Sequence, residues 1–438
     1  FFFNYFNLPN NGTGGFMEHW WYKDYSNTRI IGLESNVEFI VANGGRQKQL
    51  DWLDDVLDEA CANNNLDFVF AQLHHPFESE LWPDGNNDYV GDAIQRLEDF
   101  STDCGKPSIL FFGHTHGYSR GQSQDHQHML VNVASAGGNL DRWGEYSNQT
   151  DYEEFSISED QYGFVYLEVE AGDEPKFTLK RVSRGTPGNI LDNEVHDSVV
   201  VYKDENDPGQ PLAISPVGET VSAQCVLLEA SLFSSSFPAA EHGASQWQVF
   251  NSCGELTDPV VDIWKQYENW YFGENSQAGD DLTNQEVKGL APNTDYCWRV
   301  RYRDKNLRWG DWSDPVSFTT GNALNILLNG GAENGTGSWT VVSGKLESLT
   351  AGECDSRNPY EGQRFFCIGA ACDPAPYGEA FQTVDVSDHA ASIDAGTHTV
   401  YFGGRLADYN GTDKPEFRLT FLDDADETLD QTQKYGGR

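Results

Sequence analysis

Residues 111–120 read FFGHTHGYSR, and the first half of the chain is organised around this stretch. An apolar run, residues 108–112, ends at Gly113, where a glycine permits a sharp turn of the backbone. His114 and His116 follow the glycine directly. A buried strand that ends in such a turn delivers imidazoles to one place, and neutral imidazole suits zinc, iron and manganese ions. The pattern predicts a metal site; the simpler alternative is a pair of surface histidines at a strand end.

A second apolar run ends in the same way. Residues 67–73 are followed by His74, His75 and Pro76, and the proline ends the strand and biases His75 toward an extended backbone. Two strand-end histidine clusters within one segment of alternating strands and helices favour the metal site over chance. Three residues of the loop that follows either line the entrance to this site or are ordinary loop residues: Glu78, Glu80 and Trp82.

Together the two clusters resemble the later half of the calcineurin-like metallophosphoesterases, within the branch that resembles purple acid phosphatases. That family has an apolar strand ending in H-x-P, followed by G-H-x-H that often extends to Y-x-R. The matching residues of this sequence are His74, Pro76, Gly113, His114, His116, Tyr118 and Arg120.

The resemblance implies a set of metal ligands and a set of residues that support the motif or the substrate. The implied ligands are His74, His114 and His116. The implied supporting residues are His75, Tyr118 and Arg120. No catalytic residue beyond the ligands is implied. In the complete enzyme, two divalent or trivalent transition metals (Fe, Zn or Mn) would polarise a phosphoryl oxygen and activate a hydroxide.

The family's earlier motifs, D-x-H, G-D and G-N-H, do not occur between Phe1 and His74. In the family these motifs supply most ligands of the first metal and a bridging carboxylate. The three histidines alone are too few for two metals, because a catalytic site uses three or more protein ligands with one position open. We therefore expect this sequence to be a piece of a longer polypeptide, or a relic of one.

Composition narrows the partners and the compartment. The formal net charge of −41 is spread along the chain and argues against nucleic acid and anionic membrane surfaces as partners. No apolar run is long enough for a transmembrane segment. Eight cysteines without a C-x-x-C motif predict at least two disulfides and a secreted or cell-surface protein, with a zinc ribbon as the alternative. The acidic run at residues 423–426 would bind calcium or form a plain acidic loop.

Residues 1–203 have the element order of an α/β sheet. Apolar periodicity predicts strands at residues 29–33, 67–73, 108–112 and 129–133, and helices at residues 49–61 and 92–100. Both histidine clusters then lie at the carboxyl ends of strands, where open α/β sheets bind ligands. The closing strands are residues 163–170, 176–182 and 199–202. His126 and His128 are expected to be surface residues.

Residues 204–320 form a second domain in this interpretation. It begins with a polar linker, residues 204–211, and residues 289–296 resemble the L-x-P-x-T-x-Y corner of fibronectin type III β-sandwiches. Cys253 and Cys297 would bridge neighbouring strands. The aromatic insertion at residues 264–272 either packs over the sandwich or contacts sugar or protein.

Residues 321–438 form a third domain. Residues 325–333, followed by Trp339, resemble the opening of galactose-binding-like jelly rolls, a fold shared by several carbohydrate-binding modules. Later strands are expected at residues 381–386, 397–403 and 417–422, and we expect this domain to be incomplete at its C-terminus. The whole chain is thus predicted to hold a partial α/β metallophosphoesterase sandwich followed by two all-β sandwich domains.

Two functions follow from these resemblances. The first is a secreted, metal-dependent phosphoester hydrolase with accessory β-sandwich modules, a phosphoester substrate, and a polysaccharide or cell-surface partner. The sandwich domains could also bind calcium. The second is a non-catalytic extracellular adhesion, fibre or carbohydrate-binding protein that carries a degenerate phosphatase domain.

Overall fold

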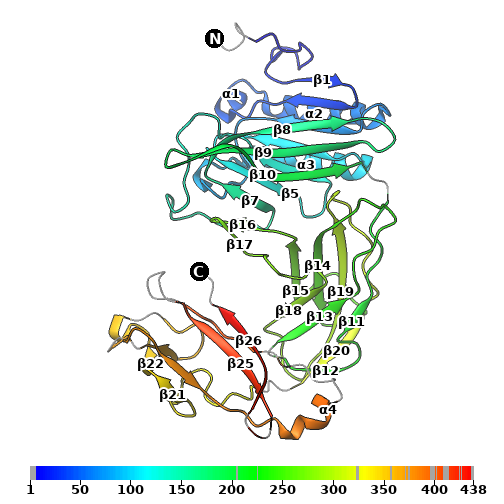
Figure 1. Ribbon diagram of the computed structural model, residues 1–438. Helices are drawn as coiled ribbons and strands as arrows, with labels where there is room; N and C mark the ends of the chain where they lie inside the picture. Colours follow the sequence, from blue (N-terminus) through cyan, green and yellow to red (C-terminus); the bar gives the residue numbers. More distant parts are fainter. Residues whose placement is uncertain are drawn as a thin grey trace. The chain divides into compact units, whose positions relative to one another are not determined.

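The computed structural model describes residues 6–435 except 204–205, 224, 322–324, 356–357, 370, 373–374, 395–399, 401, 408–413, 424 and 426. The chain forms two compact units (Figure 1). The first unit consists of Phe1–Val221, Val226–Val287 and Asn293–Gly321, and the second of Ser222–Cys225, Lys288–Pro292 and Asn322–Arg438.

Some sequence predictions lie wholly or partly outside the described residues. These are Asp204 at the start of the linker, most of the strand expected at residues 397–403, and Asp424 and Asp426 of the acidic run. The two chain ends, Phe1 and Arg438, lie outside as well.

Both histidine clusters follow strands of one nine-stranded sheet. Its strands, in spatial order, are β1 (Trp21–Tyr25), β2 (Thr28–Gly32), β3 (Phe68–Gln72), β4 (Ser108–Phe112), β6 (His128–Asn132), β5 (Tyr118–Gln122), β7 (Phe155–Glu159), β16 (Trp270–Tyr271) and β17 (Glu274–Asn275). β2, β3, β4 and β6 run parallel to one another. The four strands expected from the apolar runs are confirmed, with β4 matching its predicted range.

Two long helices cover one face of this sheet: α2 (Arg46–Ala62) and α3 (Asp88–Cys104), with the short α1 (Val37–Ala42) before them. Residues such as Leu53 and Leu57 of α2, at helical spacing, pack against Leu97 of α3 and the strand residues Val69 and Leu110. Because the strand side chains alternate, the opposite face of β3 and β4 is free to pack elsewhere.

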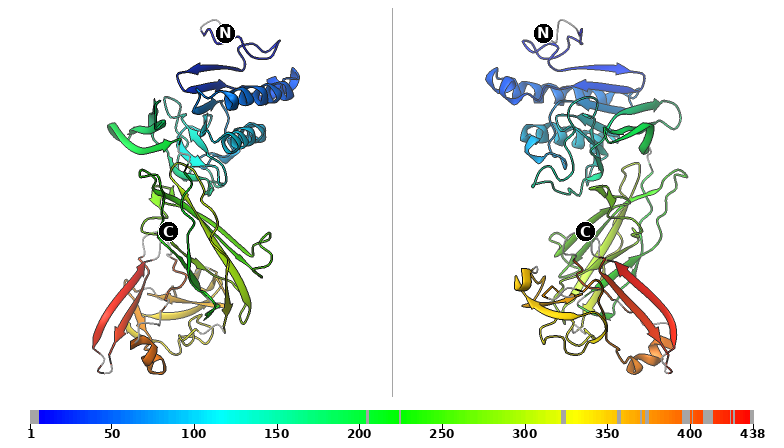
Figure 2. Two further views of the ribbon diagram at one scale, coloured as in Figure 1. Left: turned by 90° about the vertical axis from the view of Figure 1, so that its right-hand side faces the viewer. Right: turned by 60° about the vertical axis from the view of Figure 1, so that its left-hand side comes forward.

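The opposite face packs on a three-stranded antiparallel sheet of β8 (Tyr162–Glu170), β9 (Lys176–Thr186) and β10 (Asn189–Tyr202). Phe68 and Phe70 of β3 meet Phe177 and Leu179 of β9 there. Figure 2 shows the helices on one side of the large sheet and β8–β10 on the other. The first part of the chain is therefore a three-layer structure of helices, mixed sheet and antiparallel sheet.

The second sandwich of the first unit has two sheets. One contains β11 (Ala213–Ser215), β13 (Val226–Ala230) and β18 (Asn284–Val287); the other contains β12 (Thr220–Val221), β20 (Val316–Thr320), β19 (Asp295–Asp304), β14 (His242–Phe250) and β15 (Val261–Gln266). Trp247 and Trp298 are fully buried and stacked, with ring centroids 5.8 Å apart. The predicted Cys253–Cys297 disulfide is confirmed.

The aromatic insertion, residues 264–272, packs against the nine-stranded sheet and not only over its own sandwich. Its residue Trp270 pairs in parallel with Ile157 of β7, so that β16 extends the nine-stranded sheet. Earlier in the same insertion, Gln266 accepts hydrogen bonds from Gln122 and Ser156 and donates one to the Glu153 carbonyl. The insertion therefore joins the second sandwich to the first sheet.

A fully buried arginine makes a second connection between these two parts. Arg303 of β19 donates hydrogen bonds to the carbonyl oxygens of Ser123 and His126, in the turn between β5 and β6. Burial lowers the pKa of Arg303 to about 9. Arg303 thus supplies hydrogen-bond donors to carbonyls of the turn. These bonds form only when the second sandwich is docked on the first sheet.

The second unit is described more sparsely. Its strands form two-stranded sheets of β21 (Thr340–Ser343) with β24 (Glu379–Phe381), β22 (Leu346–Thr350) with β23 (Arg364–Ile368), and β25 (Glu416–Leu422) with β26 (Thr428–Tyr435). A short helix, α4 (Ala390–Asp394), and the Cys354–Cys372 disulfide complete its described part. The jelly-roll assignment and the boundaries between the three predicted domains stay predictions.

Over the described residues the chain is mostly β-structure in several sheets. Three disulfides are present there, which confirms the expectation of at least two: Cys61–Cys104, Cys253–Cys297 and Cys354–Cys372. None of the helices in that part of the chain combines the length and the apolar character needed to cross a membrane.

The expectation that His128 lies at the surface is wrong. His128 begins β6, which runs between β4 and β5 in the middle of the large sheet, and it is completely buried. Its Nδ1 atom lies 2.7 Å from the Ser108 hydroxyl, and burial lowers the pKa of the ring to about 3. His126, in contrast, lies in the turn before β6, within 2.7 Å of the Thr102 hydroxyl.

Lys106 tests how much the hydrogen bonds at the C-terminal end of α2 contribute to stability. Its buried ammonium donates to the carbonyls of Ala60, Cys61 and Asn63 at the end of α2. We expect Lys106→Met to lower the free energy of unfolding by about 2 kcal/mol, since these carbonyls lose a charged donor. Urea unfolding followed by tryptophan fluorescence measures this. Lys176→Met, which removes a surface pair with Glu170 and a contact with the Tyr202 ring, serves as control and should change little.

Arg303 tests the docking of the second sandwich. Arg303→Met should lower the free energy of unfolding by about 3 kcal/mol, because several turn carbonyls are left without donors. It should also speed proteolytic cleavage in the turn at residues 123–127. Arg308→Met, which removes a partly exposed pair with Asp207, is the matched control. Unchanged cleavage in the Arg303 variant would show that this contact does not hold the two parts together.

Candidate metal centre

The histidine clusters meet because β3 and β4 are parallel neighbours. Their pairing runs from Val69 opposite Ser108 to Gln72 opposite Phe111, so both strands end at the same edge of the sheet. The backbone N–H of Gly113 donates to the His74 carbonyl at 3.0 Å just beyond this pairing. An added Cβ at Gly113 would lie 3.1 Å from the Ala134 Cβ, which explains the glycine at this close approach.

Ser35, in the loop after β2, fixes the second histidine cluster. Its hydroxyl accepts hydrogen bonds from the backbone N–H groups of His74 and His75, each at 3.1 Å. The same oxygen lies 2.9 Å from Nδ1 of His75. Nδ1 is thereby occupied, and Nε2 of His75 remains available to an ion.

Three imidazoles form one compact group: His74, His75 and His114. One ligand nitrogen from each lies within 4.8 Å of the other two. Nε2 of His74 and Nδ1 of His114 are 3.1 Å apart. His114 has a left-handed backbone with φ of 68°, a strained conformation of the kind that gathers at functional sites.

The electrostatics of the group favour neutral imidazole. Burial, followed by repulsion from His114 and His74, lowers the pKa of His75 to about 4. Burial and then the neighbouring His74 and His116 lower the pKa of His114 as well. Both rings are therefore neutral near pH 7, which is the form that binds a metal ion.

His116 lies beside this group without joining it. Its Nδ1 donates to the Asn139 carbonyl at 2.6 Å, and its backbone N–H donates to Asp141 at 2.7 Å. Gly138 lies against the ring, where an added Cβ would come within 2.7 Å of it. A histidine that donates one ring nitrogen to a carbonyl keeps the other for a metal ion, so the predicted role of His116 as a metal ligand stays a prediction.

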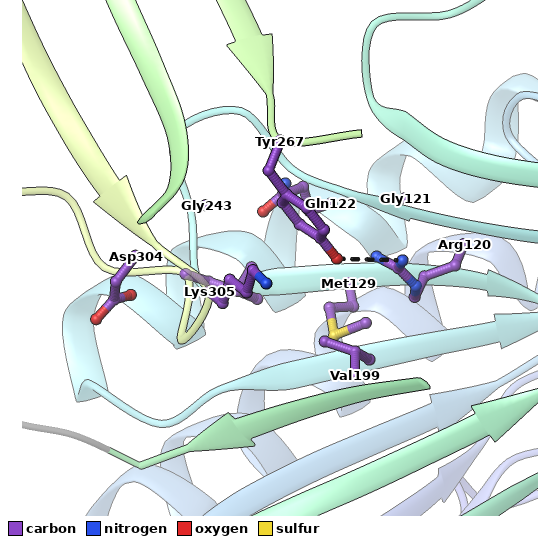
Figure 3. Close-up of a pocket in the computed structure, with 10 residues that line it drawn as sticks. Arg120, Gly121, Gln122, Met129, Val199, Gly243, Tyr267, Asp304 and Lys305 are labelled. Atoms are coloured by element: carbon purple, nitrogen blue, oxygen red, sulfur yellow. Dashed lines mark hydrogen bonds between the residues drawn. The ribbon is translucent and has the colours of Figure 1, made fainter. Parts of the chain in front are cut away.

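Tyr118 and Arg120 lie in a buried network of their own. Both bind the Asp197 carboxylate of β10, the phenol at 2.6 Å and the guanidinium at 2.6 and 3.1 Å. Arg120 also donates to Glu268 at 2.6 Å and to Tyr267 at 3.4 Å. Figure 3 shows Tyr267 reaching Arg120 from the second sandwich.

The cavity beside Arg120 has a volume of about 10 Å³. This volume is at the lower limit for a single water molecule, so the cavity is too small for a substrate. In this structure Arg120 joins the layers of the protein. Burial alone would lower its pKa, but the Asp197 carboxylate and the phenols of Tyr267 and Tyr118 hold that pKa well above its usual range.

Two loops flank the imidazole group. Trp82 belongs to the loop between β3 and α3, and its ring centroid lies 5.0 Å from that of His114. Tyr146 belongs to the loop between β6 and β7 and donates its hydroxyl to Asp141 at 3.0 Å. Sequence reasoning named Trp82 but missed Ser35 and Tyr146; the carboxyl end of β2 would have indicated Ser35, whereas Tyr146 carries no local signal.

The three imidazoles fit one transition-metal ion of modest size. Nitrogen ligands of a tetrahedral zinc ion lie about 3.3 Å apart, given Zn–N bonds of about 2.0 Å. The observed separations of 3.1 Å for one pair and 4.8 Å at most bracket that value. In the described part of the chain, no carboxylate joins this group, so the bridging carboxylate of a two-metal site is not among these residues.

Comparison with protein families gives a match over part of the second sandwich. The matching family is the Rha78A-like, N-terminal immunoglobulin domain, over residues 244–323. The second sandwich is therefore similar to an immunoglobulin-like domain. A search of curated proteins found no match.

Several solved structures are similar at the level of a coarse fold. Purple acid phosphatase PPD1 from yellow lupin (Lupinus luteus) has 15% identity and a TM-score of 0.30, over 45% of this chain and 34% of that chain. GAP50, described as the anchor in the inner membrane complex of Plasmodium, has 16% identity and a TM-score of 0.28, over 41% and 53%. Fibronectin(III)-like modules of Clostridium thermocellum CbhA have 15% identity and a TM-score of 0.20, over 39% and 74%. The matched part thus spans about half of GAP50 and a third of PPD1.

Glu80 gives a pH-dependent test of the loop that carries Trp82. This carboxyl is buried and accepts the Tyr152 N–H at 2.9 Å, and burial raises its pKa from 4.5 to about 8. Below pH 4.5 its neutral form contributes full stability, which is lost as the pH rises through about 8. We expect Glu80→Gln, which stays neutral, to become progressively more stable than the wild type from about pH 4.5 to about 8.

Thermal unfolding at a series of pH values measures this difference. Glu168→Gln on the exposed face of β8 is the control and should follow the wild-type curve. Parallel curves for the wild type and Glu80→Gln would contradict the assignment.

Proposed function

We propose that this chain binds a transition-metal ion through His74, His75 and His114 and belongs to an extracellular phosphoester hydrolase. The single observation that carries the proposal is the meeting of three ring nitrogens within 4.8 Å at the ends of two parallel strands. The purple-acid-phosphatase-like motif quoted above indicates the reaction class.

The proposed reaction is hydrolysis of a phosphoester. The P–O bond to the organic group breaks, water supplies the new P–O bond, and its protons are shared between the departing alcohol and the phosphate. A bound metal would supply Lewis acidity toward the phosphoryl oxygen. The neutral imidazoles hold the ion, Ser35 orients His75, and Asp141 and the Asn139 carbonyl hold His116 beside them. A second metal, and calcium in the sandwich domains, remain proposals.

An extracellular location is part of the proposal. Three disulfides in the described residues are typical of oxidising compartments. The immunoglobulin-like second sandwich is then an accessory module of a secreted protein, and a polysaccharide or cell-surface partner for the β-rich modules is consistent with it.

A second candidate function is supported by a different observation. No carboxylate joins the imidazole group within the described residues, which is what a degenerate site in a non-catalytic binding protein would show. Such a protein would bind at most one metal ion and would not hydrolyse phosphoesters.

Metal titration of the purified full chain tests the proposal. We expect Zn²⁺ or Mn²⁺ to bind, and His114→Ala to weaken Zn²⁺ binding by about 100-fold or more, because a ligand is lost. Isothermal titration calorimetry gives the affinity, and hydrolysis of 4-nitrophenyl phosphate gives the activity. Chelation of the metal and His114→Ala should both abolish that hydrolysis.

His126→Ala is the matched control, since His126 lies in the turn before β6 and pairs with Thr102. It should bind metal as the wild type does. Metal binding without hydrolysis would favour the non-catalytic candidate. Equal metal affinity in the wild type and His114→Ala would overturn the site itself.

A further inference from the structure

Two aromatic side chains form one surface beside the imidazole group. The ring centroids of Trp82 and His114 are 5.0 Å apart, and those of Trp82 and Tyr146 are 6.3 Å apart with an interplanar angle of 31°. Trp82 and Tyr146 are each half-buried, whereas core tryptophans such as Trp20 and Trp247 are fully buried. Part of both rings is therefore open to solvent next to the candidate metal ligands.

Hydrogen bonds hold the two rings in one arrangement. Gln149 donates to the carbonyls of Leu81 and Arg142, both at 2.8 Å, and so joins the Trp82 loop to the Tyr146 loop. The Asn148 amide adds a second cross-link, to the Asp84 carboxylate at 2.9 Å. A surface that is already ordered loses little entropy when a ligand binds to it.

The second sandwich braces the Tyr146 loop from outside. Trp143 lies against Tyr271 and Phe272 of the aromatic insertion, with ring centroids 4.9 and 5.2 Å away. Two residues before Trp143, the Asp141 carboxylate accepts the Tyr146 hydroxyl and the His116 N–H. The distance from the aromatic surface to the histidines is thereby fixed.

The charges around this surface disfavour a polyanionic ligand. Burial and the hydrogen bond to Asp141 raise the pKa of Tyr146 to about 12, and the carboxylates of Glu145 and Asp84 add to the rise. The phenol therefore stays neutral at physiological pH. Additional phosphates on a ligand would meet these carboxylates, whereas an uncharged ring would meet only Trp82 and Tyr146.

We propose that Trp82 and Tyr146 bind the organic group of the substrate, and that this group is a flat, uncharged ring. The protein then prefers aryl phosphate monoesters to alkyl monoesters and to polyphosphate esters. This inference rests on the proposed function, in which the imidazole group holds the metal that receives the phosphate. The preference for aryl over alkyl esters comes from stacking of the substrate ring against Trp82 and Tyr146. The phosphate group is the same in both esters and does not contribute to it.

Binding of inert analogues to the metal-loaded full chain tests the preference without catalysis. Phenylphosphonate and methylphosphonate share the phosphonate and differ in the ring. We expect phenylphosphonate to bind about tenfold more tightly by calorimetry. Trp82→Ala and Tyr146→Ala should each remove most of this difference, and Trp82→Phe should keep most of it. Tyr166→Ala, which removes an exposed tyrosine on β8, is the control and should leave the difference intact.

Steady-state kinetics separates binding from structural damage. Trp82→Ala should raise the KM for phenyl phosphate about tenfold relative to the KM for ethyl phosphate, with the ratio of the two kcat values nearly unchanged. A merely structural role of Trp82 would lower activity on both esters equally and would overturn the inference.

The two proposals fail in different ways. Equal affinity for the two phosphonates, or a difference that survives in both alanine variants, overturns the aromatic site while metal binding and hydrolysis stand. If neither phosphonate binds, the aromatic site is also overturned. Loss of the proposed function is seen independently, as Zn²⁺ affinity that His114→Ala does not change.

Discussion

Parallel pairing of β3 with β4 is the constraint on which the candidate site depends. Because the strands are paired in register up to Gln72 and Phe111, their continuations leave the sheet side by side. The two histidine clusters, 40 residues apart in sequence, then share one edge. The left-handed turn at His114 brings its ring beside that of His74, and Gly113 allows the two backbones to approach. A change of register by one residue would exchange the faces of a whole strand and separate the rings.

Buried cations fix how the layers are stacked. Lys106 closes the end of α2, Arg120 joins β5 to β10 and to the second sandwich, and Arg303 satisfies the turn between β5 and β6. Each cation is costly to remove from water, and each is surrounded by acceptors that only the docked arrangement provides. A buried polar network whose members are all paired makes the core rigid and favours one arrangement over others. The second sandwich is consequently part of the structure that supports the site.

Local periodicity was enough to predict the elements of the first part. β4 and the helical faces of α2 and α3 follow from apolar spacing, and the strand-end rule placed His74 and His114 together. The neighbourhood of His116 could not be predicted, because it depends on the Asn139 carbonyl, which belongs to a distant loop. The sequence indicates a surface position for His128 because no strand-end glycine precedes it, and nothing in its own segment shows that β6 runs between β4 and β5. Likewise, the composition of the aromatic insertion cannot reveal that β7 is its partner.

The short pairing of β16 with β7 has a consequence for how such proteins diversify. An open strand edge invites pairing with other chains, and here a segment of the neighbouring sandwich covers that edge. The sandwich therefore works as a guard against aggregation as well as an appendage. A related protein in which another module replaced this sandwich would have an unpaired β7 edge. The two parts are expected to have been inherited as a pair.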